Sequence, residues 1–132
     1  MIIGIIGSKT FHRPNLVKEL LYSIKTSFGP LATIVTGGQQ DGIEADVKKC
    51  CLEFQINYKE FNPSFTGWTK HSFMNENYFG KNFHPSHFDD RYKQLIYKAD
   101  TLFLGIDGEK DEKYFKKFVN LAVKKGIKSI LL

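Results

Sequence analysis

The chain has 132 residues, 42% of them apolar, which is enough to bury the core of one domain without disulfides or metals. We therefore expect a single domain over residues 1–132. The 19 Lys and Arg residues against 14 Asp and Glu give a net charge of +5, which would suit a nucleotide, a nucleic acid or an acidic protein surface. Most of the lysines are spread over predicted helices, so solvated helix faces explain the excess better than a dedicated patch.

Targeting and cysteine patterns exclude secretion and membrane insertion. No apolar run approaches the roughly 18 residues of a membrane span. Met1–Ile6 is too short and wrongly flanked for a signal peptide. Cys50 and Cys51 are adjacent, which disfavours a disulfide and predicts thiols in a reducing compartment. We expect a soluble, cytoplasmic protein with no membrane partner.

Strands and helices alternate along the first half of the chain. Met1–Ile6 is a continuous apolar run, typical of a strand buried on both faces. Residues 15–27 predict a helix, because apolar residues recur at helical spacing and Pro14 suits a first turn. Three further elements follow: a strand at 31–36, a helix at 43–54 and a short strand at 56–61.

The segment 62–85 has no strand or helix periodicity. It is dense in Phe, Asn, Gly and His around the single Trp68, and a loop of this length in a compact domain is usually functional or mobile. Its aromatic residues could stack a base, pack the loop as a lid or form a self-association surface. Regular structure then resumes with a helix at 87–98, a strand at 101–105, a helix at 111–125 and a strand at 127–132.

This alternation predicts an α/β fold: a Rossmann-like three-layer sandwich with a mostly parallel sheet of about five strands and helices on both faces. Ligands of such sheets bind beyond the carboxyl ends of the strands. The informative residues are therefore those that follow the strands. They are Gly7–Thr10, Gly37–Glu44, Asn62–Trp68 and Gly105–Gly108.

The stretch Ile34–Glu44 carries the strongest single indication of binding. A β-branched run ends at Gly37 and Gly38, and the chain restarts as a helix near Gly42. Glycine lets a ligand approach the backbone closely, and the amino end of a helix favours an anion. Strand-to-helix turns favour glycine in any case, so a plain turn is the alternative.

Four stretches spread over nearly the whole chain form one pattern. They are Ile3–Phe11, Val35–Gly38 with Gly42 and an acidic residue behind it, Arg91 eight residues before Ala99-Asp100, and Asp107-Gly108. This pattern resembles the SLOG superfamily, the Rossmann-like group that includes the DNA-processing protein DprA/Smf and the cytokinin-activating Lonely Guy enzymes. Its small single-domain YpsA/YspA-related branch, common in bacteria and phages, is the most similar.

The resemblance implies a nucleotide site at the sheet edge. It assigns binding roles to Gly7, Ser8, Lys9, Thr10, Gly37, Gly38, Gln39, Gly42, Glu44, Arg91, Asp107 and Gly108. Arg91 would bind phosphate as a bidentate fork, and Glu44 would hold a ribose hydroxyl. Glu44 is also the candidate catalytic carboxylate if the protein cleaves an N-glycosidic bond.

The chain departs from the family pattern at several positions. An extra residue precedes Gly42, Tyr92 replaces an Asn, and Ile106 replaces a Trp. Residues 109–112, Glu-Lys-Asp-Glu, stand where the family has a phosphate turn and where Lonely Guy enzymes carry a catalytic Glu. Acidic residues there would repel a phosphate by on the order of 1 kcal/mol. The resemblance therefore favours ligand binding over phosphoribohydrolase activity.

The function predicted is binding of a nucleotide or nucleotide-derived small molecule, for sensing, sequestration or processing. The ligand would be of the ADP-ribose, NAD-derivative or nucleoside-monophosphate kind, with the 62–85 loop closing over its base and no cofactor required. The alternatives are a DprA-like binder of single-stranded nucleic acid, an N-glycosidic-bond hydrolase and a degenerate scaffold. The resemblance also implies a homo-oligomer in the cytoplasm, or in the host cytoplasm for a phage-encoded chain.

Two other constellations carry weaker indications. His84 and His87, followed by Asp89 and Asp90, have the spacing of a metal site, but a polar loop is the preferred interpretation and no metal is expected. Ser8 could pair with a histidine as a nucleophile, yet no carboxylate is spaced to orient such a pair.

Overall fold

The computed structural model describes residues 1–132 and has five strands and four α-helices in alternation. The strands are β1 (Ile2–Gly7), β2 (Thr33–Thr36), β3 (Asn57–Glu60), β4 (Thr101–Gly105) and β5 (Lys128–Leu131). The α-helices are α1 (Pro14–Phe28), α2 (Gly42–Glu53), α3 (Ser86–Lys98) and α4 (Glu109–Lys124). Two short 3-10 helices are η1 (Gly29–Leu31) and η2 (Glu76–Tyr78).

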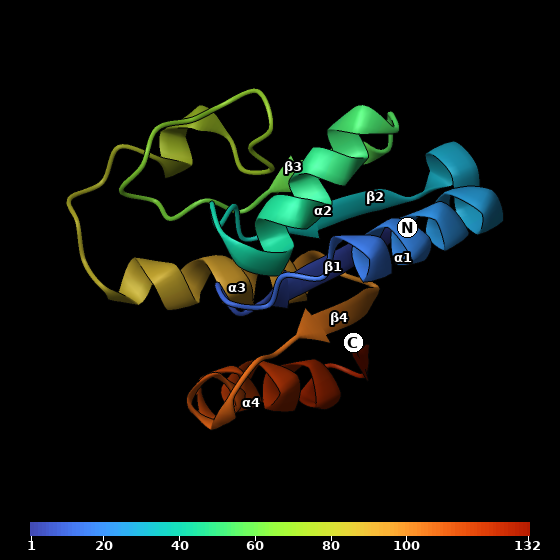
Figure 1. Cartoon of the computed structure of the whole chain (residues 1–132). Helices are drawn as coiled ribbons and strands as arrows, with labels where there is room; N and C mark the ends of the chain where they lie inside the picture. The colour runs from blue at the N-terminus through green and yellow to red at the C-terminus, as the bar shows by residue number, and fades with distance from the viewer.

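The five strands form one parallel sheet in the order β3-β2-β1-β4-β5. This confirms the predicted Rossmann-like fold. The chain builds the sheet outward from β1 in one direction and then returns to add β4 on the other side of β1 (Figure 1). The strand order therefore reverses at β1, and the carboxyl ends of β1 and β4 mark the position where ligands bind in sheets of this type.

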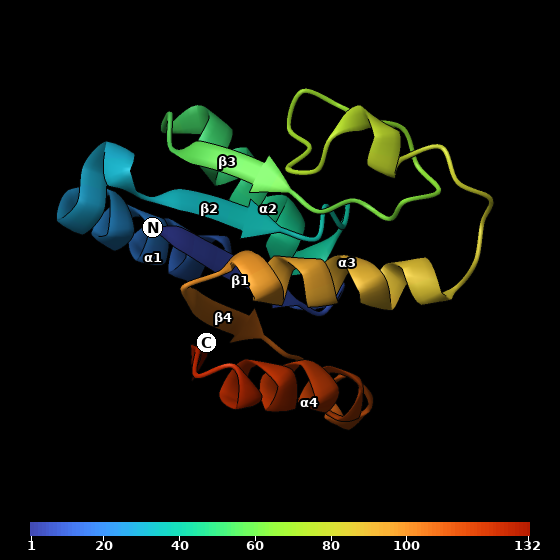
Figure 2. The same ribbon diagram turned by 180° about the vertical axis from the view of Figure 1, so that it is seen from behind.

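Helices cover both faces of the sheet and create two apolar clusters. Figure 1 shows α1 and α2 on one face, and Figure 2 shows α3 on the opposite face. Along β1, Ile3 and Ile5 pack in the α1–α2 cluster, whereas Ile6 packs in the cluster that α3 and α4 cover. Burial on both faces explains why β1 is an unbroken apolar run. None of the helices combines the length and apolarity that a membrane crossing requires.

Predicted and observed boundaries differ by two residues at the start of β2 and at the start of α4. The sequence predicts a strand from residue 31, but the strand begins at Thr33 because Gly29–Leu31 forms the 3-10 helix η1. Pro30 has no N–H to donate to a sheet, and Gly29 has a φ of 54°, so both residues favour a turn here. The other boundaries agree within about two residues, which is the usual uncertainty of helix and strand ends.

The segment between β3 and α3 folds onto the molecule. The N–H of Glu60 donates to the carbonyl of His71 at 2.8 Å, and the N–H of Phe73 donates to the carbonyl of Glu60 at 3.0 Å, so residues 71–73 run beside β3. The ring of Phe65 packs 5.4 Å from that of Phe88, in the first turn of α3. Figures 1 and 2 show this segment, green to yellow, arching from β3 to α3. These aromatic rings therefore pack the loop.

The adjacent cysteines both lie on α2. Cys50 and Cys51 are free thiols, and both are buried in the α1–α2 cluster. Burial, assisted by the neighbouring Cys50, raises the pKa of Cys51 to about 12. Since the thiolate is the reactive form, Cys51 is chemically inert while α2 stays packed.

Candidate functional site

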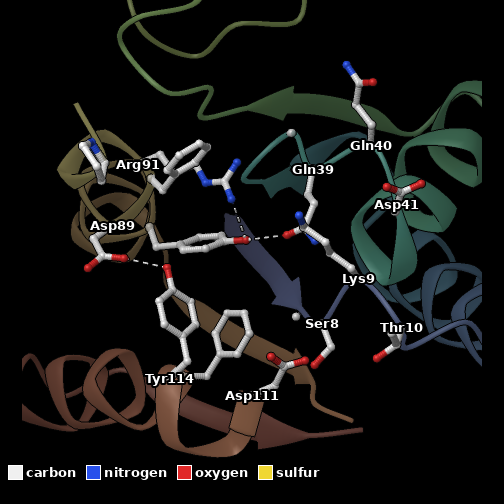
Figure 3. Close-up of a pocket in the computed structure, with 16 residues that line it drawn as sticks. Ser8, Lys9, Thr10, Gln39, Gln40, Asp41, Asp89, Arg91, Asp111 and Tyr114 are labelled. Carbon is white, nitrogen blue, oxygen red and sulfur yellow. Dashed lines mark hydrogen bonds between the residues drawn. The ribbon is translucent and has the colours of Figure 1, made fainter. Parts of the chain in front are cut away.

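A cavity of about 740 Å³ lies over the carboxyl end of β1, between the start of α2 on one side and α3 and α4 on the other (Figure 3). We call it the first cavity. It is lined by Gly7, Ser8, Lys9, Thr10, Gly38, Gln39, Gln40, Asp41, Pro85, Phe88, Asp89, Arg91, Tyr92, Asp111, Tyr114 and Phe115.

Most of the predicted site residues meet at this cavity. Those that line it are Gly7, Ser8, Lys9, Thr10, Gly38, Gln39 and Arg91. Asp107 lies next to it, since its N–H donates to Ser8 Oγ at 2.9 Å. Gly108 lines a different cavity, beside β5. The remaining predicted residues, Gly37, Gly42 and Glu44, do not line the first cavity.

Glu44 lies buried behind the two glycine-rich turns, with 1% of its surface exposed. Its Oε1 accepts the N–H of Gly37 at 2.7 Å and of Gln39 at 3.4 Å. Its Oε2 accepts the N–H of Gly7 at 3.3 Å and the hydroxyl of Tyr92 at 2.6 Å. One carboxylate thus joins the turns after β1 and β2 to α3. The main-chain amides expected to hold a ligand phosphate are occupied by a carboxyl group of the chain itself.

This geometry gives Glu44 a positioning role and leaves it no route to a ribose hydroxyl or a scissile bond. Burial raises the pKa of Glu44, while the charge of Arg91 and the hydrogen bonds from Tyr92, Gln39 and Gly7 oppose the rise. Burial and the adjacent Glu44 carboxylate raise the pKa of Tyr92 well above its usual value. Tyr92 therefore stays protonated and donates to Glu44.

Arg91 is held by the protein at the cavity wall. Its Nη1 donates to the carbonyl of Gly37 at 3.1 Å and its Nη2 to the Tyr92 hydroxyl at 3.3 Å. Its guanidinium carbon lies 4.5 Å from the centre of the Tyr92 ring. The buried Nε has no hydrogen-bond partner. Since a guanidinium has five N–H donors, Arg91 keeps donors that a ligand could use.

Two of the glycines are required by the packing of the turns. A side chain at Gly7 would collide with the backbone of Gly105 and with Ile43. Gly42 has a φ of 73°, and a side chain there would collide with the backbone of Ser8. The turn after β1, the start of α2 and the end of β4 therefore need glycine to approach one another. The glycines at these two positions are therefore explained by close packing of the chain.

The cationic side chains that line the first cavity are those of Lys9 and Arg91, and Asp41 connects the cavity wall to the start of α2. Asp41 precedes this helix and makes no capping hydrogen bond with its side chain. The first N–H groups of a helix have no partner within it, and they form the positive end of the helix dipole. Lys9 and Thr10 line the cavity next to this end, and Figure 3 shows Lys9 reaching toward the side where Arg91 lies. The side of the cavity between Lys9 and Arg91 therefore favours an anion, whereas the Asp41 carboxylate opposes one close to the helix.

Three carboxylates also line the first cavity, and the sequence reasoning did not assign them. Asp89 accepts hydrogen bonds from the Tyr114 hydroxyl and from Lys117 Nζ, both at 2.6 Å. Burial alone would raise the pKa of Asp89, but these two hydrogen bonds together with the charges of Lys117 and Lys93 lower it. Asp41 and Asp111 make no ion pair, so both can accept hydrogen bonds from a ligand.

Some of these residues had a signal in the sequence. Phe88, Arg91 and Tyr92 are spaced i, i+3 and i+4, which places them on one face of a helix. Arg91 alone was predicted, so its two neighbours on that face could have been added. Asp111 lies in the stretch that departs from the family pattern, and no spacing rule places it in the cavity.

A second cavity of about 720 Å³ shares the turn Gly38–Gln40 with the first. Residues of α2 form one of its walls, and the loop from Asn62 to Thr69 forms another. The loop predicted to close over a ligand in the first cavity lies mainly here. Only Pro85, at the end of that loop, lines the first cavity.

The histidines of the loop do not assemble a metal site. His84 Nδ1 lies 2.8 Å from Ser86 Oγ, a local contact at the start of α3. No group of three or more His, Cys, Asp or Glu side chains is close enough to hold a metal ion.

Comparison of the sequence with models of known protein families and with characterised proteins finds no match in either case. The SLOG resemblance therefore stays a prediction that is based on the motifs.

Proposed function

We propose that this protein binds a nucleotide or nucleotide-derived small molecule in the first cavity, as a SLOG-like domain that senses, sequesters or processes its ligand. The observation that supports this most is the mixed lining of that cavity. The cationic donors of Lys9 and Arg91 line it together with the unpaired carboxylates of Asp41 and Asp111.

A nucleotide carries the chemical groups that such a lining complements. Its phosphate would bind between Lys9 and the free donors of Arg91, where an ammonium and a guanidinium line the same cavity. Its ribose hydroxyls and base amino groups would donate hydrogen bonds to the carboxylates of Asp41 and Asp111. The ring of Phe88, 38% exposed, offers an apolar contact for the base. Inorganic phosphate or a polyphosphate would offer these carboxylates no hydrogen-bond donor, and its negative charge would repel theirs.

Binding, rather than glycosidic hydrolysis through Glu44, is the activity proposed. Glu44 is buried and its oxygens accept four hydrogen bonds from the protein. A general acid or base has to reach the atom that gains or loses the proton, and Glu44 does not line the cavity.

Isothermal titration calorimetry with AMP, ADP-ribose and NAD tests the proposal. We expect saturable binding of at least one of them, and Lys9→Ala should weaken it about tenfold, the value of one charge-assisted hydrogen bond. Lys124→Ala is the matched control, because it removes the same charge at the far end of α4. Absence of binding by all three ligands, or an equal loss in the control, would refute the proposal.

A further inference from the structure

The second cavity has a buried carboxylate on its wall. Glu60, at the end of β3, lines this cavity and is 4% exposed. Its Oε2 accepts the Tyr58 hydroxyl at 2.7 Å and lies 3.4 Å from Lys48 Nζ. The only partner of its Oε1 is the same Lys48 Nζ, at 3.5 Å. Oε1 therefore keeps most of its capacity to accept a hydrogen bond, although it is almost fully buried.

A chain of hydroxyl groups holds this carboxylate in place. Tyr58 donates its only hydroxyl proton to Glu60, so the Thr36 hydroxyl, 2.8 Å away, donates to the Tyr58 oxygen. Thr36 Oγ1 in turn accepts the N–H of Gly38 at 3.1 Å. Gly38 belongs to the turn shared by the two cavities. Glu60 is thus oriented by β2, β3 and this turn, which is the preorganisation that a binding site needs.

An unpaired aromatic ring lines the same cavity. Trp68 is 47% exposed, and its ring makes no contact with another aromatic ring, whereas Phe61 stacks on Phe73 at 4.7 Å and Phe65 packs against Phe83 at 4.9 Å. The segment that carries it is ordered by a hydrogen bond from the N–H of Thr69 to Ser72 Oγ at 3.0 Å. Trp68 is a flat apolar surface, and a planar ligand ring could stack on it.

The charges around the cavity select among ring-bearing ligands. Lys48 and Lys49 line it together with the single carboxylate of Glu60. Two ammonium groups against one carboxylate disfavour a cationic ligand such as an aromatic amine. A neutral ring that carries hydroxyl donors satisfies both the Glu60 oxygen and the Trp68 surface, and a nucleoside has this chemistry.

We infer that the second cavity is a separate nucleoside site, in which the base stacks on Trp68 and the ribose hydroxyls donate to Glu60. The inference goes beyond the proposed function, because this site uses neither the phosphate nor any residue of the corner near Lys9. It also gives the loop from Asn62 to Thr69 a defined role as one wall of a binding site.

The native chain can test this directly, because Trp68 is its only tryptophan. Titration with adenosine should quench the tryptophan fluorescence and saturate. Half-maximal quenching by 2′,3′-dideoxyadenosine should require about tenfold more ligand than with adenosine, since the dideoxy compound lacks the hydroxyls that donate to a charged acceptor. No quenching by adenosine, or equal affinities for the two nucleosides, would overturn the inference without any substitution.

Substitutions provide the second measurement. Glu60→Gln should weaken adenosine about tenfold and dideoxyadenosine much less, after circular dichroism has shown that the variant is folded. Trp68→Ala, followed by calorimetry, should weaken both nucleosides about tenfold or more through lost stacking. Lys124→Ala should change neither. Equal weakening of both nucleosides by Glu60→Gln, or unchanged binding in Trp68→Ala, would overturn the inference.

The two proposals fail in different ways. Fluorescence quenching by adenosine in a protein that binds none of AMP, ADP-ribose or NAD at the first cavity refutes the proposed function and supports the nucleoside site. Binding of AMP that depends on Lys9, with no response of Trp68 to adenosine, supports the proposed function and refutes the nucleoside site.

Discussion

Glu44 shows at the scale of one residue how a protein can supply the hydrogen-bond acceptor for its own turns. Amides of Gly7, Gly37 and Gln39 converge on its carboxylate, an arrangement that resembles the binding of a phosphate by a glycine-rich loop. Because these donors are already paired, a ligand gains little from them. The binding capacity of the first cavity shifts to Lys9 and to the free donors of Arg91.

Glu44→Gln should lower the free energy of unfolding by about 2 kcal/mol, because the new amide N–H₂ faces main-chain donors and leaves at least one of them unpaired. Tyr92→Phe is the matched variant. It removes one of the four donors and keeps the carboxylate with the other three, so we expect a smaller loss of about 1 kcal/mol. Urea unfolding followed by far-ultraviolet circular dichroism measures both. A Glu44→Gln protein as stable as the native chain would show that Glu44 does not hold the turns.

At the scale of the elements, the aromatic contacts between the long loop and α3 decide where the loop lies. The ring of Phe65 contacts Phe83, His87 and Phe88, and two of these residues belong to α3. Main-chain hydrogen bonds at Glu60 attach the other part of the loop to β3. The loop is therefore fastened at two points, and the walls of both cavities depend on it.

Phe65→Ala should release one of these two attachments. We expect amide hydrogen exchange to accelerate about tenfold or more within residues 62–85, while the amides of α1 and β1 keep their rates, because local opening becomes easier and the core is unchanged. Tyr22→Ala is the control, since Tyr22 is 73% exposed on α1. Exchange in the loop that is as slow as in the native chain would mean that the main-chain hydrogen bonds hold the loop without Phe65.

At the scale of the whole molecule, the fold could be predicted because most of its strands are short runs rich in apolar or β-branched residues between helices with a clear period, β3 (Asn-Tyr-Lys-Glu) being the exception. The parallel order then placed the turns after β1 and β2 at one edge, so Gly7–Thr10, Gly38 and Gln39 were found together. The partners of Glu44 could not be predicted, since they come from three segments that meet only in the folded chain. The loop from Asn62 to Pro85 has no period, and its aromatic contacts gave no signal in the sequence.

The thiols of α2 allow the stability of the whole molecule to be measured. Cys50 and Cys51 are covered by α1, and the pKa of Cys51 rises to about 12 through burial. A thiol-specific reagent should therefore label Cys51 only when α2 separates from α1, at a rate that increases with urea. Cys50→Ser and Cys51→Ser assign the signal to one sulfur. Labelling in water as fast as in the urea-unfolded chain would contradict this expectation.

The packing of these two sulfur atoms has a practical consequence for purification and storage. Oxidants and alkylating agents can modify Cys51 only in molecules that have opened, so the fraction modified at Cys51 accumulates with time and records past excursions from the native state. A mass spectrum of the stored protein, with each adduct counted, would then report the history of each sample without an added dye.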